Sequence, residues 1–187
     1  MSPTTVQTFY GLLAAAGVIA IAVIWFVRGA ALVSASARGV DHALAGSLGP
    51  SAVLLALVVA ILATGGSLYF SEVAGYAPCT LCWYQRIAMY PLVVILGVAA
   101  IRRDRSGVPA AIVLAAIGAV IAAYHVALEW IPALDTGACD ATAPCTVVWF
   151  RALGVFSLPT LALVAFLLII TMLTVRATAP DPERSRS

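Results

Sequence analysis

Charge is what this 187-residue chain has least of: only 10% of its residues are charged, whereas 63% are hydrophobic. An ordinary soluble domain has roughly 25% charged residues, so a water-soluble globule is excluded. Lysine is absent, and the 10 basic residues, all arginine, face 8 acidic ones. No basic patch is dense enough to bind nucleic acid. The sequence therefore indicates a membrane protein that contacts lipid and not nucleic acid.

Five long apolar runs contain most of the hydrophobic residues. Each has about the 20 residues that a helix needs to cross a bilayer at about 1.5 Å per residue. We therefore predict an all-α membrane protein with five spans, in which one additional N-terminal transmembrane helix precedes a four-helix bundle. The runs are residues 9–27, 51–70, 83–101, 109–131 and 157–175.

The arginines lie mostly on one side of these predicted spans. Eight of the ten fall between spans one and two, between spans three and four, or after span five, and none precedes Phe9. Basic residues in short loops stay in the cytoplasm, so we expect the N-terminus outside and the C-terminus inside. Tryptophan and tyrosine residues gather at the predicted outer ends, as in an interfacial aromatic belt.

A cleaved signal peptide is the competing interpretation of the first span, because Ala35-Ser36-Ala37 resembles a peptidase site. Cleavage would reverse the later spans and place the arginines of these loops and of the tail outside, and the run from Phe9 is longer than a signal-peptide core, so we keep the span. Residues 34–50 are interpreted as a cytoplasmic linker, in which His42 has no chemical role. The predicted regions are an accessory helix and linker over 1–45, a four-helix bundle over 46–176 and a disordered tail over 177–187.

All four cysteines fall on the predicted outer side, where disulfides form. Cys79 and Cys82 begin the third span, and Cys139 and Cys145 lie in the loop after the fourth. Inert disulfides, a four-cysteine zinc site and redox-active pairs are the possible interpretations. The two-residue spacing closes too small a loop to brace a fold, and a helix N-terminus stabilises a thiolate, which favours redox activity. A whole transmembrane hairpin separates the pairs, which disfavours zinc, and we expect no metal.

Arg86 is placed on the same helix face as Cys79 and Cys82, about one turn deeper than Cys82. A charged side chain inside a span costs about 2.5 to 3.5 kcal/mol and is kept mainly for function. We expect Arg86 to lower the pKa of Cys82 and to bind an oxygen that becomes negative when a lipid-soluble electron acceptor is reduced. The alternative is an arginine whose head group returns to the outer interface.

The segment from Glu72 to Pro91, with its sequence PCTLCWYQR, resembles the active-site segment of the disulfide bond formation protein B (DsbB) family, most closely its short-loop BdbC branch. The resemblance covers residues 54–175. It departs from the family in the extra first span and in a compact loop over 132–150. Further matching segments are Tyr124 to Glu129 (YHVALE), Cys139 to Thr146 (CDATAPCT) and Ser157 to Pro159 (SLP).

This resemblance implies a protein of the bacterial cytoplasmic (inner) membrane that re-oxidises a soluble or membrane-anchored thioredoxin-fold, DsbA-like partner on the outer face. It also implies that the electrons pass to a quinone, either ubiquinone or menaquinone. By the same resemblance, Cys139 forms the mixed disulfide with the partner and Cys145 passes the electrons to Cys79. Cys82 then faces the quinone beside Arg86.

His125 is expected near the outer end of the fourth span, about where a quinone beside Arg86 would have its ring. A histidine side chain can deliver a proton to a reduced quinone near neutral pH. A hydrogen-bonded core histidine is the alternative. Glu129, one turn further out, is interpreted as an interfacial carboxylate.

Two other functions stay open at this point. One is a quinone-linked reductase of the vitamin K epoxide reductase type, although in those proteins the loop cysteines precede the two-residue-spaced pair and here the order is reversed. The other is a non-catalytic membrane scaffold whose cysteines form structural disulfides. The sequence shows no pair of spans broken by Gly and Pro in matching positions, as transporter sites often have.

Overall fold

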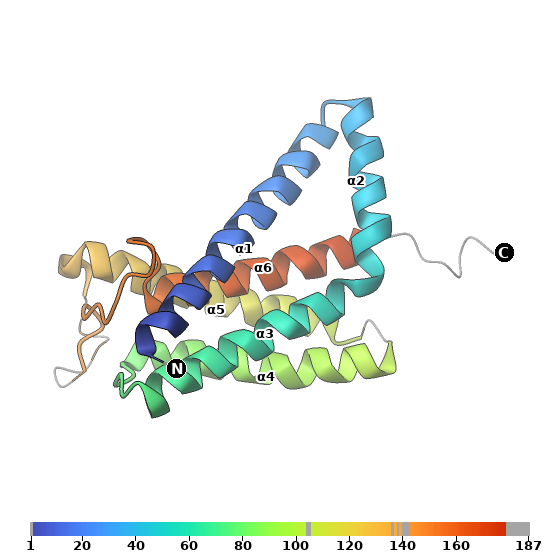
Figure 1. Ribbon diagram of the computed structural model, residues 1–187. Helices are drawn as coiled ribbons and strands as arrows, with labels where there is room; N and C mark the ends of the chain where they lie inside the picture. Colours follow the sequence, from blue (N-terminus) through green and yellow to red (C-terminus); the bar gives the residue numbers. More distant parts are fainter. Residues whose placement is uncertain (1, 104–105, 136, 138, 140–142, 179–187) are drawn as a thin grey trace.

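The computed structural model describes residues 2–103, 106–135, 137, 139 and 143–178. Four helices lie side by side in it and form an elongated bundle (Figure 1). These helices are α3 (Ala52–Leu68), α4 (Thr80–Arg102), α5 (Val108–Trp130) and α6 (Leu158–Thr178). Short helical turns flank them, namely η1 (Gly49–Ser51), η2 (Tyr69–Val73, a π-helical turn) and η3 (Pro132–Leu134).

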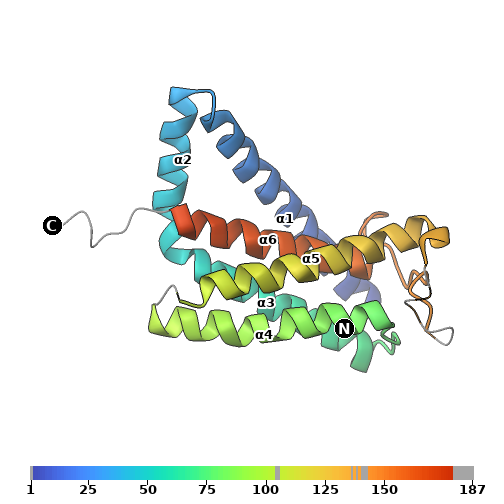
Figure 2. The same ribbon diagram turned by 180° about the vertical axis from the view of Figure 1, so that it is seen from behind.

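Two further helices precede the bundle. α1 (Pro3–Ala31) starts at the end of the bundle that holds the cysteine loops and leaves it obliquely, and α2 (Ala35–Leu48) returns to α3 at a steep angle (Figures 1 and 2). The start of α1 and the end of α6 lie at opposite ends of the bundle. α1 is attached to α6 by hydrogen bonds from Trp25 Nε1 to Thr171 Oγ1 (3.1 Å) and from Arg28 to the Thr174 carbonyl (3.3 Å).

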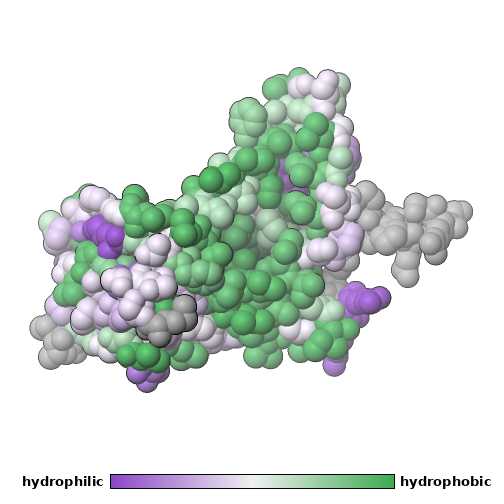
Figure 3. Space-filling view, in the orientation of Figure 1, coloured by the Kyte–Doolittle hydropathy of each residue, from purple (hydrophilic) through white to green (hydrophobic). Residues whose placement is uncertain are grey.

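The predicted fold class is confirmed. The described residues contain helices and no β-strand, and five helical segments among them are long and apolar enough to cross a membrane. Apolar side chains cover the middle of the molecule in Figure 3, whereas paler and purple residues gather toward its two ends, as a bilayer requires. The orientation of the chain across the membrane stays a prediction.

Residues 34–50, interpreted from the sequence as a linker, are mostly helical. Most of them form α2, whose N-cap is Ser34, with Oγ accepting from the backbone N–H of Ala37 at 3.5 Å. An ion pair of 3.6 Å between Arg28 of α1 and Asp41 of α2 fixes the helix from the side. Alanines, an N-cap and a tertiary contact here outweigh the unfavourable helix propensity of the glycines. The predicted tail also differs at its start, since α6 continues to Thr178; residues 179–187 lie outside the described part.

The core of the bundle is apolar and closely packed. Gly118 of α5 permits the closest approach, because a Cβ atom there would lie 2.3 Å from the ring of Phe166 on α6. The absence of a side chain at this position lets the aromatic ring lie directly against the α5 backbone. The largest fully buried apolar side chains are Phe166, Leu92, Leu96, Leu128, Ile169, Leu173 and Val175.

Candidate active site

The first cysteine pair sits at the amino end of α4. Cys79 is the N-cap residue, and its Sγ accepts a hydrogen bond from the backbone N–H of Cys82 at 3.4 Å. One helical turn brings the two sulfur atoms to 2.9 Å from each other, and both cysteines are free thiols in this structure. Cys79 is buried and Cys82 is half-buried. The local helix therefore holds the two sulfur atoms close together.

The thiol of Cys79 is an unusually strong acid. The Cys82 thiol donates a hydrogen bond to it, and this bond is the largest cause that lowers the pKa of Cys79. His125 lowers the pKa further through its own hydrogen bond, with Nε2 at 3.7 Å from the sulfur, and burial opposes both effects. The free N–H groups of the α4 N-terminus favour a thiolate at the same place.

The second pair, Cys139 and Cys145, forms a disulfide. Cys145 is 1% exposed and packs in one apolar cluster with Cys79, whereas Cys139 is half-buried at the edge of that cluster. The two cysteines of this disulfide thus differ in exposure: Cys139 is partly accessible, and Cys145 is buried beside the first pair. A four-cysteine zinc site is not present, because this disulfide uses two of the four sulfur atoms.

His125 lies between the two pairs. Its Nε2 is 3.1 Å from the carbonyl oxygen of Cys145 and 3.7 Å from Cys79 Sγ, and its Nδ1 is 3.0 Å from Nε2 of Gln85. With the amide of Gln85 in this orientation, Nδ1 is the acceptor, so Nε2 carries the proton that faces Cys145 and Cys79. His125 is only 3% exposed. Its nitrogen and the sulfur atoms of Cys79 and Cys82 all lie within 4.8 Å of one another.

Arg86 is buried and points toward α3. Its Nε donates to Ser67 Oγ at 3.0 Å, and an Nη donates to the Ser67 carbonyl at 3.1 Å. The guanidinium also lies 5.0 Å from the ring centre of Trp83, and the side chain is 9% exposed. This geometry does not support a head group that returns to the interface. Within the described part of the chain, Arg86 forms no ion pair, so its charge lacks an acidic partner there.

A cavity of about 230 Å³ opens beside Arg86. It extends from Cys82 to Tyr90 along α4, a distance of about 12 Å at the rise of an α-helix. Its walls are mostly apolar residues of α1, α3 and α6, and Gln85 and Arg86 are among its few polar groups. Such a lining, apolar with a few polar groups, is typical of a site for an apolar ligand with a polar head.

A second cavity of about 210 Å³ lies beside the first cysteine pair, and Pro144 and Val147 from the segment around Cys145 line it as well. His125 and Glu129 line it, and Cys82 lines both cavities. Glu129 is half-buried and accepts a hydrogen bond from Ser157 Oγ at 2.6 Å, so it is not a freely solvated carboxylate. Cys82 is thus the cysteine that lines both cavities.

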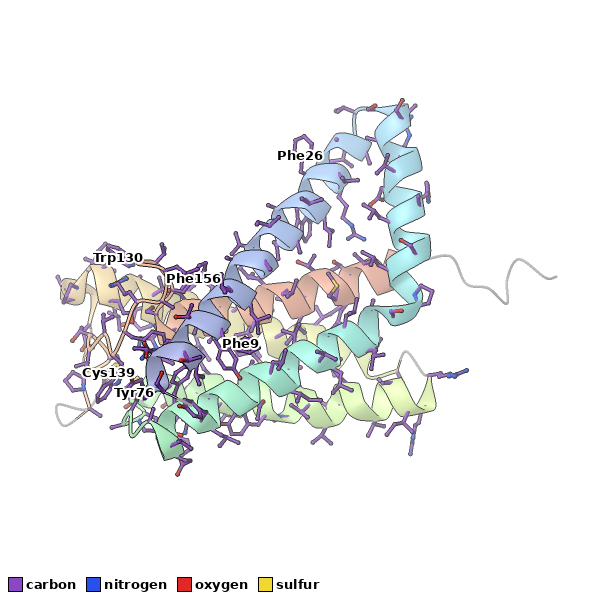
Figure 4. The ribbon with its side chains drawn as sticks, in the orientation of Figure 1. Phe9, Phe26, Tyr76, Trp130, Cys139 and Phe156 are labelled. Atoms are coloured by element: carbon purple, nitrogen blue, oxygen red, sulfur yellow. A yellow bond between two sulfur atoms is a disulfide. The ribbon has the colours of Figure 1, made fainter. Side chains whose placement is uncertain are left out.

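Aromatic rings connect the segments on which the two pairs lie. Tyr76 stacks on Trp149, with ring centres 4.9 Å apart, and on Phe70, at 5.9 Å. Phe150 lies 5.1 Å from Phe70. Figure 4 shows Tyr76 and Cys139 at the same end of the bundle, next to the start of α1. These contacts hold the chain before Cys79 against the chain after Cys145.

Comparison with known proteins identifies the family. The family model "Disulfide bond formation protein DsbB" matches residues 50–176, more than half of the chain. The chain belongs to the DsbB family. The match covers α3, α4, α5, nearly all of α6 and both cysteine pairs, and it leaves α1 and all of α2 outside.

Relatives of the DsbB family carry matching names. The chain is 44% identical over 122 residues to "Probable disulfide formation protein" of Oceanobacillus iheyensis, which is 64% of this chain and 84% of that relative. It is also 44% identical over 114 residues to "Disulfide bond formation protein C" of Bacillus subtilis, or 60% of this chain and 83% of the relative. No solved structure matches the chain. These matches show that the chain is a membrane protein that functions in disulfide formation. The resemblance to the DsbB family is confirmed.

The structure brings together the residues singled out in the sequence, with one difference in placement. Arg86 and Cys82 share the larger cavity, but of the two cavities His125 lines only the smaller one. Sequence reasoning missed Ser67 and Gln85, which hold Arg86 and His125. Gln85 could have been noticed, because it follows Cys82 by three residues on the same helix. Ser67 lies in an apolar run and carries no such signal.

Proposed function

We propose that this DsbB family member is a quinone-linked dithiol oxidase, which re-oxidises a thioredoxin-fold partner and passes the electrons to membrane quinone. The observation that carries the proposal is Arg86, a buried cation without an acidic partner among the described residues, in an apolar cavity beside Cys82. A buried charge is costly without an opposite charge beside it, and the two hydrogen bonds to Ser67 leave the positive charge of Arg86 unneutralised. A lipid-soluble acceptor whose oxygens become negative on reduction supplies that compensation.

The electrons would enter at the second pair. A thiolate of the partner attacks the Cys139 sulfur, forms a mixed disulfide and breaks the Cys139–Cys145 bond. The second thiolate of the partner then resolves the mixed disulfide, so that the partner leaves oxidised and the loop pair holds two electrons and two protons. The half-buried position of Cys139 supports this choice, because Cys145 is 1% exposed.

The loop pair would then reduce the first pair. Cys145 attacks an oxidised Cys79–Cys82 pair at Cys79 and releases Cys82 as a thiolate. Attack by Cys139 on Cys145 restores the loop disulfide and releases Cys79. The structure has the product arrangement of this exchange, with a disulfide in the loop and two thiols at α4. The lowered pKa of Cys79 makes it a good leaving group.

The residues at the larger cavity fit a quinone. A bound quinone supplies the capacity to accept two electrons and two protons from a dithiol. Arg86 would orient the head group and stabilise negative charge on an oxygen, and Cys82 would present its sulfur to the ring. The apolar walls from α3 and α6 would exclude water and hold the tail.

His125 would serve the exchange between the cysteine pairs. Its Nε2 faces both the Cys145 backbone and Cys79 Sγ, so it can hold a proton between the attacking and leaving sulfur atoms. This proposal moves His125 from the side of the quinone, where the sequence suggested it, to the smaller cavity.

The active cysteines would lie on the outer face of a bacterial cytoplasmic membrane. Arg28, Arg38 and Arg102 belong to the end of the molecule opposite the cysteine loops, where α1 meets α2 and α4 ends (Figure 1). Positively charged ends of this kind stay in the cytoplasm. The first pair and its partner would therefore meet in the oxidising compartment.

An anaerobic assay tests the proposal directly. The purified full chain is mixed with a reduced thioredoxin-fold partner and a short-chain quinone, and the quinone absorbance is followed. We expect one quinone reduced per partner dithiol oxidised, no reduction with Cys82→Ser, and normal reduction with the matched control Thr80→Ser, which alters the same turn but keeps both thiols. Partner reduction on addition of a quinol instead would identify a reductase. Full activity of Cys82→Ser would refute the proposed path.

A further inference from the structure

α1, which lies outside the family match, forms part of the larger cavity. Tyr10, Leu13 and Ala14 of α1 line it together with Arg86 and Cys82. The Oceanobacillus relative has 84% of its length inside its match, so only about one sixth lies outside, less than the 29 residues of α1. A helix of this length is therefore an addition to the DsbB-like part, and it closes one side of the cavity.

Tyr10 packs directly against α3. Its hydroxyl donates a hydrogen bond of 3.0 Å to the carbonyl oxygen of Leu62, and its ring covers Gly66, where a Cβ atom would come within 2.7 Å of Tyr10 Cζ. Only glycine allows the ring to lie this close to the α3 backbone. The next residue, Ser67, holds Arg86 through two hydrogen bonds. Tyr10 and Arg86 are thus fixed by adjacent residues of one helix.

The N-terminal half of α1 also contacts the segments that carry the cysteines. Gln7 Nε2 donates to the hydroxyl of Tyr76 at 2.8 Å, and a Cβ atom at Gly11 would lie 2.8 Å from the Cβ of Ala152. Ala14, one turn further along, is 6% exposed. The opposite face of α1 carries exposed apolar side chains, and Figure 4 shows Phe26 pointing away from the bundle. One face of α1 therefore meets the cavity and the other is left for lipid.

We propose that α1 is the lipid-side wall of the acceptor cavity, and that Tyr10 and Ala14 are specificity-determining residues for the quinone. Tyr10 limits the width of the cavity near Arg86, and the small side chain of Ala14 leaves space for the part of the acceptor that follows the ring. The inference deepens the proposed function and rests on it. It predicts that substitutions on α1 change which quinones bind without changing recognition of the protein partner.

Quinone binding without turnover provides the test. A quinone is titrated into the purified, oxidised full chain, and Kd is measured from quenching of tryptophan fluorescence, since Trp149 lines the cavity. We expect Ala14→Leu to raise Kd about tenfold because the added carbons occupy the cavity. The matched control is Ala16→Leu, the same change at an exposed position of α1, which is expected to leave Kd unchanged.

If Ala14→Leu fails to fold, a second variant still tests the proposal. Tyr10→Leu removes the ring that packs on Gly66 and so widens the cavity. The Kd for a two-ring quinone should therefore fall several-fold relative to the Kd for a one-ring quinone. Wild-type Kd values and ratios in both α1 variants would overturn the inference and leave α1 as an anchor. If the wild-type chain binds no quinone and reduces none, the proposed function itself fails, which is a different result.

Discussion

His125 Nε2 lies 3.1 Å from the carbonyl oxygen of Cys145, which places the histidine between the two cysteine pairs. This position predicts which step depends on it. Replacement by Gln should slow electron transfer from the loop pair to the α4 pair by about 10²-fold, the lower end of general acid–base effects. Stopped-flow oxidation of the reduced loop pair measures that rate.

The same variant distinguishes the two placements of His125. We expect His125→Gln to leave the Kd for quinone unchanged, because His125 does not line the cavity of Arg86. A raised Kd with a normal exchange rate would instead support the sequence-based hypothesis of a histidine at the quinone. His42→Gln, at an exposed position of α2, is the matched control and should change neither quantity.

Arg86→Gln is predicted to weaken quinone binding far more than it weakens partner recognition. Loss of a charged hydrogen-bonding group costs about 1.5 to 3 kcal/mol, or roughly 10- to 100-fold in Kd. Arg102→Gln removes the same charge from the other, exposed end of α4 and should leave quinone binding as in the wild type. Tryptophan quenching gives the Kd for quinone, and steady-state kinetics gives the KM for the reduced partner. Equal effects on both constants would contradict the place of Arg86 at the acceptor.

The lowered pKa of Cys79 predicts how the reduced protein responds to pH. The folded state binds the proton on Cys79 less tightly than the unfolded state, whose thiol has an ordinary pKa near 9.0. The contribution of Cys79 to stability is therefore complete above that pKa and is lost as pH falls toward the folded pKa. Unfolding of the reduced chain and of Cys79→Ser at several pH values should show the difference shrinking with acid.

Ultraviolet absorbance of the thiolate separates the causes of that shift. The hydrogen bond from Cys82 is the larger cause and the one from His125 is smaller. We thus expect Cys82→Ala to raise the pKa of Cys79 more than His125→Ala does. The reverse order would mean that the histidine controls the acidity.

The sequence was sufficient to predict the five membrane-spanning helices and to place Cys79 and Cys82 at the start of one of them. Apolar length identifies membrane spans because every backbone polar group in lipid must be satisfied inside a helix. The spacing of Cys79, Cys82 and Arg86 on one helical face likewise follows from helix geometry alone.

Contacts between helices could not be predicted from the sequence in the same way. Nothing local to Ser67 or Tyr10 indicates that one holds Arg86 and the other closes the cavity, because each role depends on a partner distant in the chain. The position of His125 relative to the two cavities depends on packing as well. α2 was missed for a related reason, since its Arg28–Asp41 ion pair joins two helices.

Packing of α5 on α6 predicts a stability change that is independent of redox chemistry. A Cβ atom at Gly118 would lie 2.3 Å from the ring of Phe166, a fully buried side chain. Gly118→Ala should therefore destabilise the bundle by about 1 to 3 kcal/mol, as overpacking of a core does. Gly39→Ala is the matched control, because a Cβ atom there meets nothing within 4 Å and alanine favours the α2 helix by roughly 0.5 to 1 kcal/mol. Thermal unfolding in detergent should thus show a lower Tm for the first variant and an equal or higher Tm for the second. A Tm unchanged by Gly118→Ala would mean that α5 and α6 can separate at this point, and the close contact would then contribute little to the stability of the bundle.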